Sequence, residues 1–312
     1  MTKTAFLFAG QGAQYVGMGR DLYEAYPESR RIFEAADKAL EFPLSSLCFE
    51  GPHEELTRTH NCQPAVLTVS IAAWEAFRVR DAAAADAVAG LSLGEYSALT
   101  AAGALDFKDA VRLVRRRGEF MEEAAGEKQG KMLSVIGLDR ETVRDITGQS
   151  HTEIANLNCP GQIVISGGVE EIARAQALAE QKGAKMTVAL EVSGAFHSSF
   201  MNGAAKRLAQ ELQGVTVRPP RVPVISNVTA LTVGSPDEIR QNLTRQVAGS
   251  VLWEDSMNLL TAQGVGTFFE FGPGKVLKGL MRRINREVTV TTIETAEDIA
   301  RLSQAKGAED AA

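Results

Sequence analysis

The segment Gly90-Leu91-Ser92-Leu93-Gly94 limits the possible folds of this chain more than any other part of the sequence. It has the form Gly-x-Ser-x-Gly, follows a short run of small apolar residues and precedes a helical stretch. In a nucleophile elbow of this form the serine occupies a strained turn between strand and helix, where side chains in place of the glycines would collide. The pattern is typical of an α/β fold whose serine hydroxyl stands above the sheet. A serine in an ordinary glycine-rich loop is the alternative reading.

Strand and helix patterns alternate along most of the chain, which supports an α/β fold. The predicted strands of this alternating part are residues 4–9, 87–89, 222–226 and 267–271. The predicted helices are residues 21–40, 64–79, 94–104, 109–125 and 199–212.

A different order separates the two halves of this alternating part. Strands are predicted at residues 131–138, 153–158, 162–166 and 185–192, and helices at residues 140–146 and 170–182. The order β-α-β-β-α-β over about seventy residues is that of a ferredoxin-like domain, which we expect to be an insertion. We therefore expect a large subdomain (residues 1–126 and 198–295), a small ferredoxin-like subdomain (127–197) and a loosely ordered tail (296–312).

Composition and charge exclude several classes of protein. The 312-residue chain is 45% hydrophobic and 23% charged, the balance of a soluble globular protein with a sizeable core. Its net charge of −6 argues against nucleic acid as a partner, because phosphate backbones require a basic face. The longest apolar stretch, residues 65–74, has about half of the roughly 20 residues that a membrane span needs, and the first residues lack a signal-peptide pattern. Three cysteines without CxxC spacing indicate neither disulfides nor a zinc site, so we expect a cytoplasmic protein.

A catalytic serine requires a base, which is normally histidine. Of the four histidines, only His151 and His197 follow Ser92 in the chain, as the base does in enzymes with a nucleophile elbow. His151 lies in a polar run that predicts an exposed loop. His197 follows a strand and precedes a helix, where functional side chains are usually presented. His197 is the predicted base, and a structural histidine is the alternative.

Two further segments are candidates for a site around Ser92. Gly10-Gln11-Gly12 follows the first strand without the glycine pattern of a phosphate-binding loop, so a tight turn with exposed N–H groups, suited to an oxyanion hole, is expected. Arg115-Arg116-Arg117 lies late in a predicted helix. Such runs usually form solvated faces, but one arginine directed into the site would bind a carboxylate through a bidentate pair. Spacing alone does not tell which arginine this is.

Taken together, these segments resemble the malonyl-CoA:acyl carrier protein transacylases of fatty-acid synthesis. The resemblance extends from Thr4 to about Arg286 and includes several motifs in the family's order. They are AGQGAQ (residues 9–14), GLSLGEYSAL (90–99), DAVRLVRRRGEFMEEA (109–124), NCPGQIVISG (158–167), SGAFHSS (193–199), TRQV (244–247) and FGPGKVLKGL (271–280).

The resemblance implies roles for individual residues. Ser92 matches the acylated nucleophile of the family, and His197 matches its general base. Gln11 and Leu93 match the positions whose backbone N–H groups form the oxyanion hole. Arg117, the third of the three arginines, matches the residue that pairs with the malonyl carboxylate.

Two more positions follow from the same resemblance. Gln246 matches a glutamine whose backbone carbonyl orients the histidine, so the family works with a dyad and no catalytic acid. Phe196 resembles the bulky residue of malonyl-selective members, whereas methylmalonyl-selective relatives tend to carry a smaller one. A core phenylalanine that anchors the loop is the alternative reading of Phe196. The implied fold is an α/β-hydrolase-like large subdomain with the ferredoxin-like insertion. The implied substrates are malonyl-CoA and phosphopantetheinylated acyl carrier protein, with no metal or redox cofactor.

The chain departs from the usual family pattern at two positions, and alternative functions stay open. Leu91 replaces a common histidine before the serine, so any polar role of that position is absent, and Ala9 replaces a frequent proline.

The same module serves fatty-acid and polyketide synthesis. A serine thioesterase would share the elbow and the base but let water finish the reaction. A non-catalytic protein that docks carrier proteins is the third alternative.

A predicted helix at residues 275–287 suggests how a carrier protein would bind. Its apolar residues recur at about the helical period on one side. A basic stripe on the other side consists of Lys275, Lys278, Arg282 and Arg286. The stripe would attract the carrier protein, whose family is typically acidic, over a long range. An ordinary solvated face is the alternative.

Overall fold

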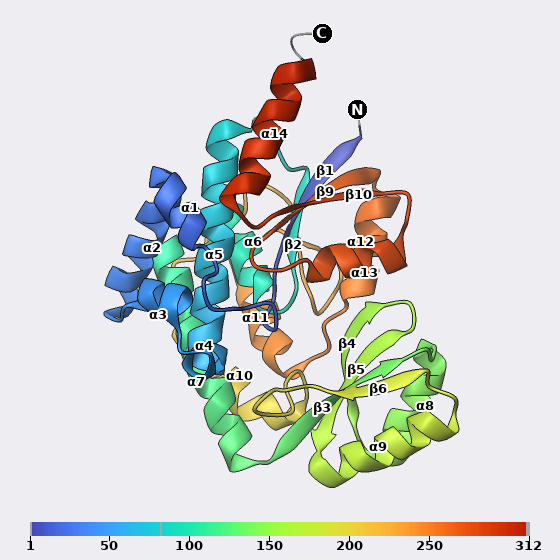
Figure 1. Ribbon diagram of the computed structural model, residues 1–312. Helices are drawn as coiled ribbons and strands as arrows, with labels where there is room; N and C mark the ends of the chain where they lie inside the picture. Colours follow the sequence, from blue (N-terminus) through green and yellow to red (C-terminus); the bar gives the residue numbers. More distant parts are fainter. Residues whose placement is uncertain (1, 82, 310–312) are drawn as a thin grey trace.

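A six-stranded sheet is the frame of the larger part of the protein, seen in a computed structural model that describes residues 2–81 and 83–309 (Figure 1). Its strands are β1 (Lys3–Phe8), β2 (Ala87–Gly90), β7 (Val224–Ile225), β8 (Thr232–Val233), β9 (Val265–Phe271) and β10 (Thr289–Ile293). They lie in the order β10-β9-β1-β2-β7-β8. All neighbours pair in parallel except β8, which pairs antiparallel with β7. The carboxyl ends of β1, β2, β9 and β10 therefore share one edge of the sheet, where sites of α/β folds are normally built.

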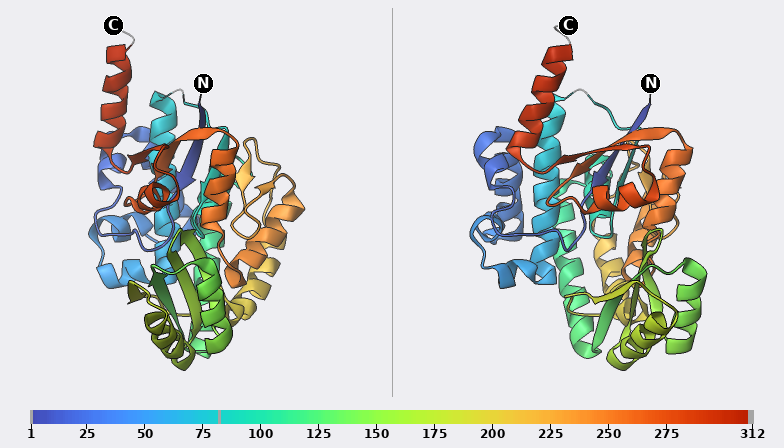
Figure 2. Two further views of the ribbon diagram at one scale, coloured as in Figure 1. Left: turned by 90° about the vertical axis from the view of Figure 1, so that its right-hand side faces the viewer. Right: turned by 45° about the vertical axis from the view of Figure 1, so that its right-hand side comes forward.

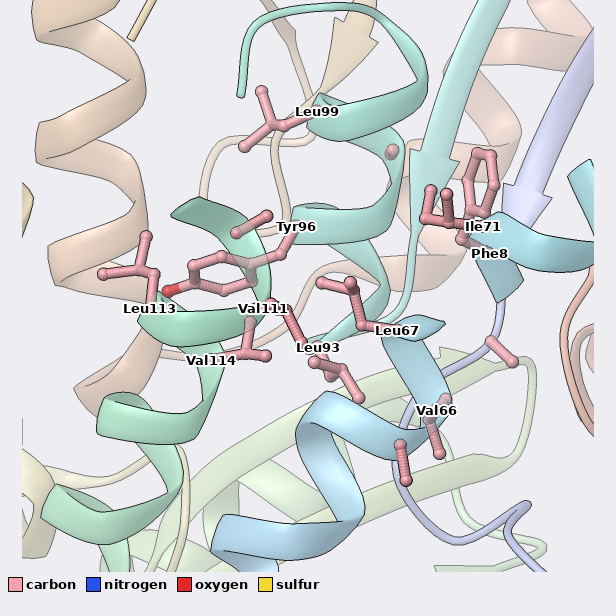
Figure 3. Packing of buried hydrophobic residues seen from close by; sticks show 14 of the residues in the cluster. Phe8, Val66, Leu67, Ile71, Leu93, Tyr96, Leu99, Val111, Leu113 and Val114 are labelled. Carbon is pink, nitrogen blue, oxygen red and sulfur yellow. The ribbon is translucent and has the colours of Figure 1, made fainter. Parts of the chain in front are cut away.

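Helices cover both faces of this sheet, and alternate residues of β1 show which helices lie on which face. Phe6 and Phe8 belong to a buried cluster with α5 (Thr59–Arg80), α6 (Gly94–Ala101) and α7 (Phe107–Glu127). Figure 3 shows side chains of these three helices meeting in that cluster. Ala5 and Leu7 instead share a cluster with α12 (Trp253–Ala262) and α13 (Val276–Ile284). Because both faces are covered, the strands are apolar on both sides.

The remaining helices of the larger part surround these layers. They are α1 (Arg20–Ala25), α2 (Pro27–Leu40), α3 (Leu44–Glu50), α4 (His53–Thr57), the short 3-10 helix η1 (Ser199–Met201), α10 (Asn202–Gln213) and α11 (Pro236–Ala248). α2 packs on α5, and α10 packs between α7 and α11.

A second, four-stranded sheet forms the smaller part of the molecule (Figure 2). It consists of β3 (Gly130–Ile136), β4 (Glu153–Cys159), β5 (Gln162–Gly168) and β6 (Met186–Ala189), in the antiparallel order β4-β5-β3-β6. Helices α8 (Arg140–Ser150) and α9 (Val169–Gln181) cover one face with an apolar core of their own. From the other face, Met132 and Val164 join the main core of the larger part. The strand order is that of a ferredoxin-like unit, and the predicted fold class is confirmed. The exact division of the chain at residues 127 and 197 stays a prediction.

Two predicted elements differ from the structure. The single helix expected at residues 21–40 is two helices, α1 and α2, because Pro27 restricts the residue before it. That residue, Tyr26, is extended with φ −127°. The loosely ordered tail expected at 296–312 is wrong for its first part, where α14 (Ala296–Glu309) forms a helix. Ile299 is buried and fastens α14 to the main core, whereas residues 310–312 lie outside the described ranges.

A helix that spans a membrane must be both long and apolar enough to cross the bilayer. Over residues 2–81 and 83–309, no helix meets both requirements.

Candidate active site

Ser92 occupies a sharp turn between β2 and α6, as the Gly-x-Ser-x-Gly pattern predicts. Its φ of 52° lies in the left-handed region, which is uncommon for residues other than glycine. A Cβ on Gly90 would come within 2.0 Å of the Gly94 carbonyl oxygen. A Cβ on Gly94 would come within 2.2 Å of the Phe8 carbonyl oxygen. Both glycines are therefore required, one by the turn itself and the other by close packing on β1.

His197 is the histidine that reaches Ser92. Its Nε2 accepts a hydrogen bond from the Ser92 hydroxyl at 2.8 Å, and its Nδ1–H donates to the backbone carbonyl of Gln246 at 2.8 Å. The carbonyl contact fixes the neutral tautomer whose free nitrogen faces the serine. His151, the other candidate, is exposed at the end of α8.

The protonation state of His197 follows from its surroundings. Burial and the nearby Arg117 guanidinium lower the pKa of His197 to about 4, against an ordinary value of 6.5. The imidazole is thus uncharged at neutral pH and able to take a proton from Ser92. The pKa of the buried Arg117 is itself lowered by burial, without making it neutral under ordinary conditions.

Arg117 is the arginine of the three that points into the site. It is 2% exposed, and its Nη2 donates to Ser92 Oγ at 3.1 Å. Nη1 donates to Gln63 Oε1 at 2.6 Å. Because Gln63 lies on α5, this bond ties the guanidinium to the helix that packs beside α7. Arg115 and Arg116 point elsewhere and bind Glu119 at 3.0 and 2.6 Å. The structure therefore resolves the choice that spacing left open.

Gln11 and Leu93 lie on the two segments that meet at the elbow. A Cβ on Gly10 would come within 2.6 Å of the Leu91 carbonyl oxygen, so the turn after β1 touches the elbow directly. Within the described part of the chain, the N–H groups of Gln11 and Leu93 have no hydrogen-bond acceptor. Two N–H groups left unpaired beside a serine hydroxyl are what an oxyanion hole requires.

A cavity of about 650 Å³ opens beside Gln11, lined by residues of α4, α5 and α7 and by the loop that precedes His197. Thr59 and Glu122 line it from the larger part, and Ser193 lines it from the loop that leads to His197. Ser92 and His197 are not among its lining residues, so the cavity lies beside the oxyanion-hole turn and does not include the nucleophile.

Phe196 lies directly before the base and is 5% exposed. Its side chain belongs to the main core, and its carbonyl oxygen accepts a hydrogen bond from Ser166 Oγ at 2.6 Å. On the other side of His197, the N–H and the hydroxyl of Ser199 donate to Glu153 Oε1 at 3.0 and 2.6 Å. Since Ser166 lies on β5 and Glu153 on β4, the small sheet holds both flanks of the base. These contacts fit the alternative in which Phe196 is a core residue that anchors the loop. A role of Phe196 in selecting malonyl over methylmalonyl groups stays a prediction.

Sequence reasoning missed three buried polar residues that complete the site. Gln63 binds Arg117, the Asn227 side chain binds the backbone at Ser92 and Gly90, and Glu95 accepts a hydrogen bond from the Asn227 N–H. Burial raises the pKa of Glu95 to about 7. Glu95 lies inside the GLSLGEYSAL motif, so its position was visible in the sequence. Asn227 could not be found in the same way, because it lies in the loop after β7, outside every motif of the sequence analysis.

The comparison with known proteins fits this geometry. The pattern of the family described as "Acyl transferase domain" matches residues 5–307. The malonyl CoA-acyl carrier protein transacylase of Bacillus subtilis is 49% identical over 96% of this chain and 96% of its own length. The chain belongs to this acyltransferase family. The malonyl CoA-acyl carrier protein transacylase of Escherichia coli is 42% identical over 96% of this chain and 98% of its own length.

Solved structures of the acyltransferase family have the same fold. One, described as a type II PKS acyl-carrier protein in complex with its malonyl-transacylase, superimposes with a TM-score of 0.94 at 38% identity. The match covers 97% of this chain and 100% of the other. The chain is therefore an acyltransferase, as the sequence predicted.

Proposed function

We propose that this acyltransferase moves a malonyl group from malonyl-CoA to the phosphopantetheine thiol of an acyl carrier protein, for fatty-acid biosynthesis, through an ester on Ser92. The observation that carries the proposal is the buried Arg117, whose Nη2 lies 3.1 Å from Ser92 Oγ. A buried cation beside the nucleophile selects an acyl group that ends in a carboxylate. The names of the relatives at 49% and 42% identity agree with this substrate.

The proposed cycle has two half-reactions of the same form. His197 takes the proton of Ser92, whose Oγ attacks the thioester carbonyl, and the N–H groups of Gln11 and Leu93 bind the resulting oxyanion. The C–S bond then breaks, and coenzyme A leaves with the proton that His197 returns to its sulfur. The carrier's thiol then gives its proton to His197, and its sulfur attacks the ester carbonyl. The C–O bond to Ser92 breaks, His197 returns the proton to Ser92 Oγ, and the malonyl group stays on the carrier as a thioester. The Gln246 carbonyl holds the imidazole throughout. Because the overall reaction exchanges one thioester for another and changes no oxidation state, we expect no metal or redox cofactor.

A polyketide synthase acyltransferase is the second candidate function. The specific observation in its favour is the structural similarity to the complex that contains a type II PKS acyl-carrier protein. Chemistry at Ser92 would be identical, and only the carrier would differ. Comparing transfer rates to a fatty-acid carrier and to a polyketide carrier distinguishes the two.

We propose that the carrier protein docks on α13 through the basic stripe of Lys275, Lys278, Arg282 and Arg286, all of which are exposed. α13 ends at Ile284, so the helix predicted to reach 287 is shorter and Arg286 lies beyond it. Leu277, Leu280 and Met281 are buried on the opposite side, which leaves the cations facing outward. The stripe would attract an acidic carrier by long-range electrostatics.

The cellular location is part of this proposal. Cys48, Cys62 and Cys159 are all free and buried, which agrees with a reducing cytoplasmic compartment. Locating the tagged protein by cell fractionation tests it.

Mass spectrometry of the intact protein after exposure to a mixture of acyl-CoA thioesters tests the proposed function. We expect a malonyl adduct that is absent from Ser92→Ala and that free carrier protein removes. A serine thioesterase would instead release malonate to water without added carrier. No adduct on the wild-type chain would support the non-catalytic docking alternative and overturn the proposal.

A further inference from the structure

The strained backbone of Ser92 requires contacts that hold it. A φ of 52° at a residue other than glycine persists only where the surrounding structure fixes it. The dyad of Ser92 and His197 acts on the hydroxyl and does not constrain the peptide groups on either side. Other residues must therefore hold the turn.

Asn227 contacts the turn from the neighbouring strand. Its Oδ1 accepts a hydrogen bond from the Ser92 N–H at 2.6 Å, and its Nδ2 donates to the Gly90 carbonyl at 2.8 Å. β2 pairs with β7 through Val88 and Val224, and Asn227 follows shortly after β7. A side-chain amide offers one acceptor and one donor group, as a peptide does. Asn227 thus continues the ladder of the sheet at the point where β2 turns into the elbow.

Glu95 binds both residues that hold Ser92, Asn227 through its backbone and Gln246 through its side chain. Its Oε2 accepts from the Asn227 backbone N–H at 3.1 Å and from Gln246 Nε2 at 2.6 Å. Gln246 Nε2 also donates to the Ser92 carbonyl at 2.9 Å. The N–H and the C=O of Ser92 are therefore bound by the side chains of two residues that both donate a hydrogen bond to the Glu95 carboxylate. Asn227 is 1% and Glu95 2% exposed, so water does not compete for these bonds.

We propose that Asn227 is a positioning residue that holds the Ser92 elbow in its reactive conformation, with Glu95 fixing Asn227 and Gln246 around it. Asn227 engages the Ser92 N–H, which leaves the next N–H, that of Leu93, to face the acyl oxygen. A turn that rotated about this point would displace the hydroxyl and the Leu93 N–H together. The inference rests on the proposed function, because it explains how the same nucleophile is held.

Replacing Asn227 by Ala tests the proposal in a single-turnover measurement of loading from malonyl-CoA. We expect loading to slow by about tenfold to a hundredfold with KM nearly unchanged, because the lost bonds act on the turn and not on the substrate. Asn242→Ala is the matched control. Asn242 is 4% exposed on α11, and its side-chain NH₂ group has no partner in the described part of the chain. If the two variants load at the same rate after correction for folded fraction, Asn227 is only structural and the inference is wrong.

Asn227→Asp supplies a second readout that does not depend on the alanine variant folding. A protonated carboxyl group offers one donor and one acceptor, as the amide does, whereas a carboxylate has no donor for the Gly90 carbonyl. Loading relative to wild type should therefore rise as the pH falls from about 8 to about 5.5, since burial raises the pKa of a carboxyl group. The same ratio for Asn227→Ala should stay flat. A flat ratio for Asn227→Asp would contradict the proposal.

The wild-type protein in the same assay separates this inference from the proposed function. If malonyl-CoA does not load wild type, the proposed function fails and takes the inference with it. If wild type loads, Ser92→Ala does not, and Asn227→Ala equals its control, the inference alone fails.

Discussion

The guanidinium of Arg117 donates a hydrogen bond to the hydroxyl of Ser92 at 3.1 Å. A carboxylate bound by this guanidinium would lie one hydrogen bond away from the nucleophile. In a malonyl thioester a single methylene separates the carboxylate from the reacting carbonyl. Binding one end at Arg117 therefore brings the other end to Ser92, which is how positioning accelerates a reaction.

Arg117→Ala should damage malonyl loading selectively. The variant leaves the substrate carboxylate without a partner in a desolvated pocket, so we expect kcat/KM for malonyl-CoA to fall by about tenfold to a hundredfold. Acetyl-CoA loses no partner, and the acetyl-to-malonyl preference should rise. Arg116→Ala, an exposed residue of the same run, is the control. An equal loss on both substrates would make Arg117 structural.

The loading rate should begin to fall at a much lower pH than it would with an ordinary histidine as the base. The base must be neutral, and because the pKa of His197 is lowered to about 4, loading should change little from pH 7 to pH 5 and fall near pH 4. NMR titration of labelled histidine measures the same value directly. Since Arg117 is one of the causes, Arg117→Ala should move the His197 pKa upward. Titration of His197 near 6.5 in the wild-type protein would refute this prediction.

The two members of the dyad should act as a unit. Ser92→Ala should abolish covalent loading, and His197→Ala should slow it by on the order of a thousandfold. The double variant should be no slower than Ser92→Ala alone. Single-turnover loading with labelled malonyl-CoA measures all three, and unfolding by urea checks that each variant is folded. An undiminished adduct on Ser92→Ala would place the ester elsewhere.

Phe196→Ser distinguishes a gate from an anchor. As a gate, the smaller side chain admits an α-methyl group, and loading of methylmalonyl-CoA should improve several-fold relative to malonyl-CoA. As an anchor, the buried ring holds the loop of His197, so both substrates should lose rate equally. Competition between the two thioesters, read by mass spectrometry, decides between these outcomes.

Charge reversal on α13 should affect one half-reaction only. Lys278→Glu combined with Arg282→Glu should slow transfer to the carrier protein at low salt and leave loading from malonyl-CoA nearly unchanged. The difference should fade with added salt, because the Debye length is only about 10 Å at 0.1 M. Arg31→Glu with Lys38→Glu is the control, since both residues are exposed on α2 and the net charge changes equally. Equal carrier rates for the two double variants would exclude α13 as the docking surface.

The sequence predicted the elbow and the small sheet, because the residues that define each of them are close together in the chain. The elbow was visible because its glycines, its serine and the flanking strand and helix are contiguous. The small sheet was visible because its strands and helices follow one another in a recognisable order. The choice of Arg117 over its two neighbours came only from the family resemblance, and the helix geometry now accounts for it.

The other contacts of the site join residues that lie far apart in the chain, and no local sequence pattern predicts such pairs. Asn227 and Ser92 lie 135 residues apart in the chain, and Gln246 and Ser92 lie 154 apart. The sequence predicts a strand at residues 222–226, which contains the two-residue β7, but no local pattern marks Asn227 beyond it as a partner of Ser92. The helical tail was missed because its polar composition is typical of a loose end, whereas the burial of Ile299 depends on a distant helix.

The flanks of His197 are tied to β4 and β5, while Ser92 is built on β2 of the other sheet. The predicted catalytic pair therefore depends on both sheets, and its 2.8 Å hydrogen bond depends on how the two sheets pack together. A change in how the two sheets pack would shift the backbone on both sides of His197, while the Gln246 carbonyl on α11 still holds its ring. The hydrogen bond between Ser92 and His197 is therefore sensitive to the alignment of the two sheets as well as to the residues of the site.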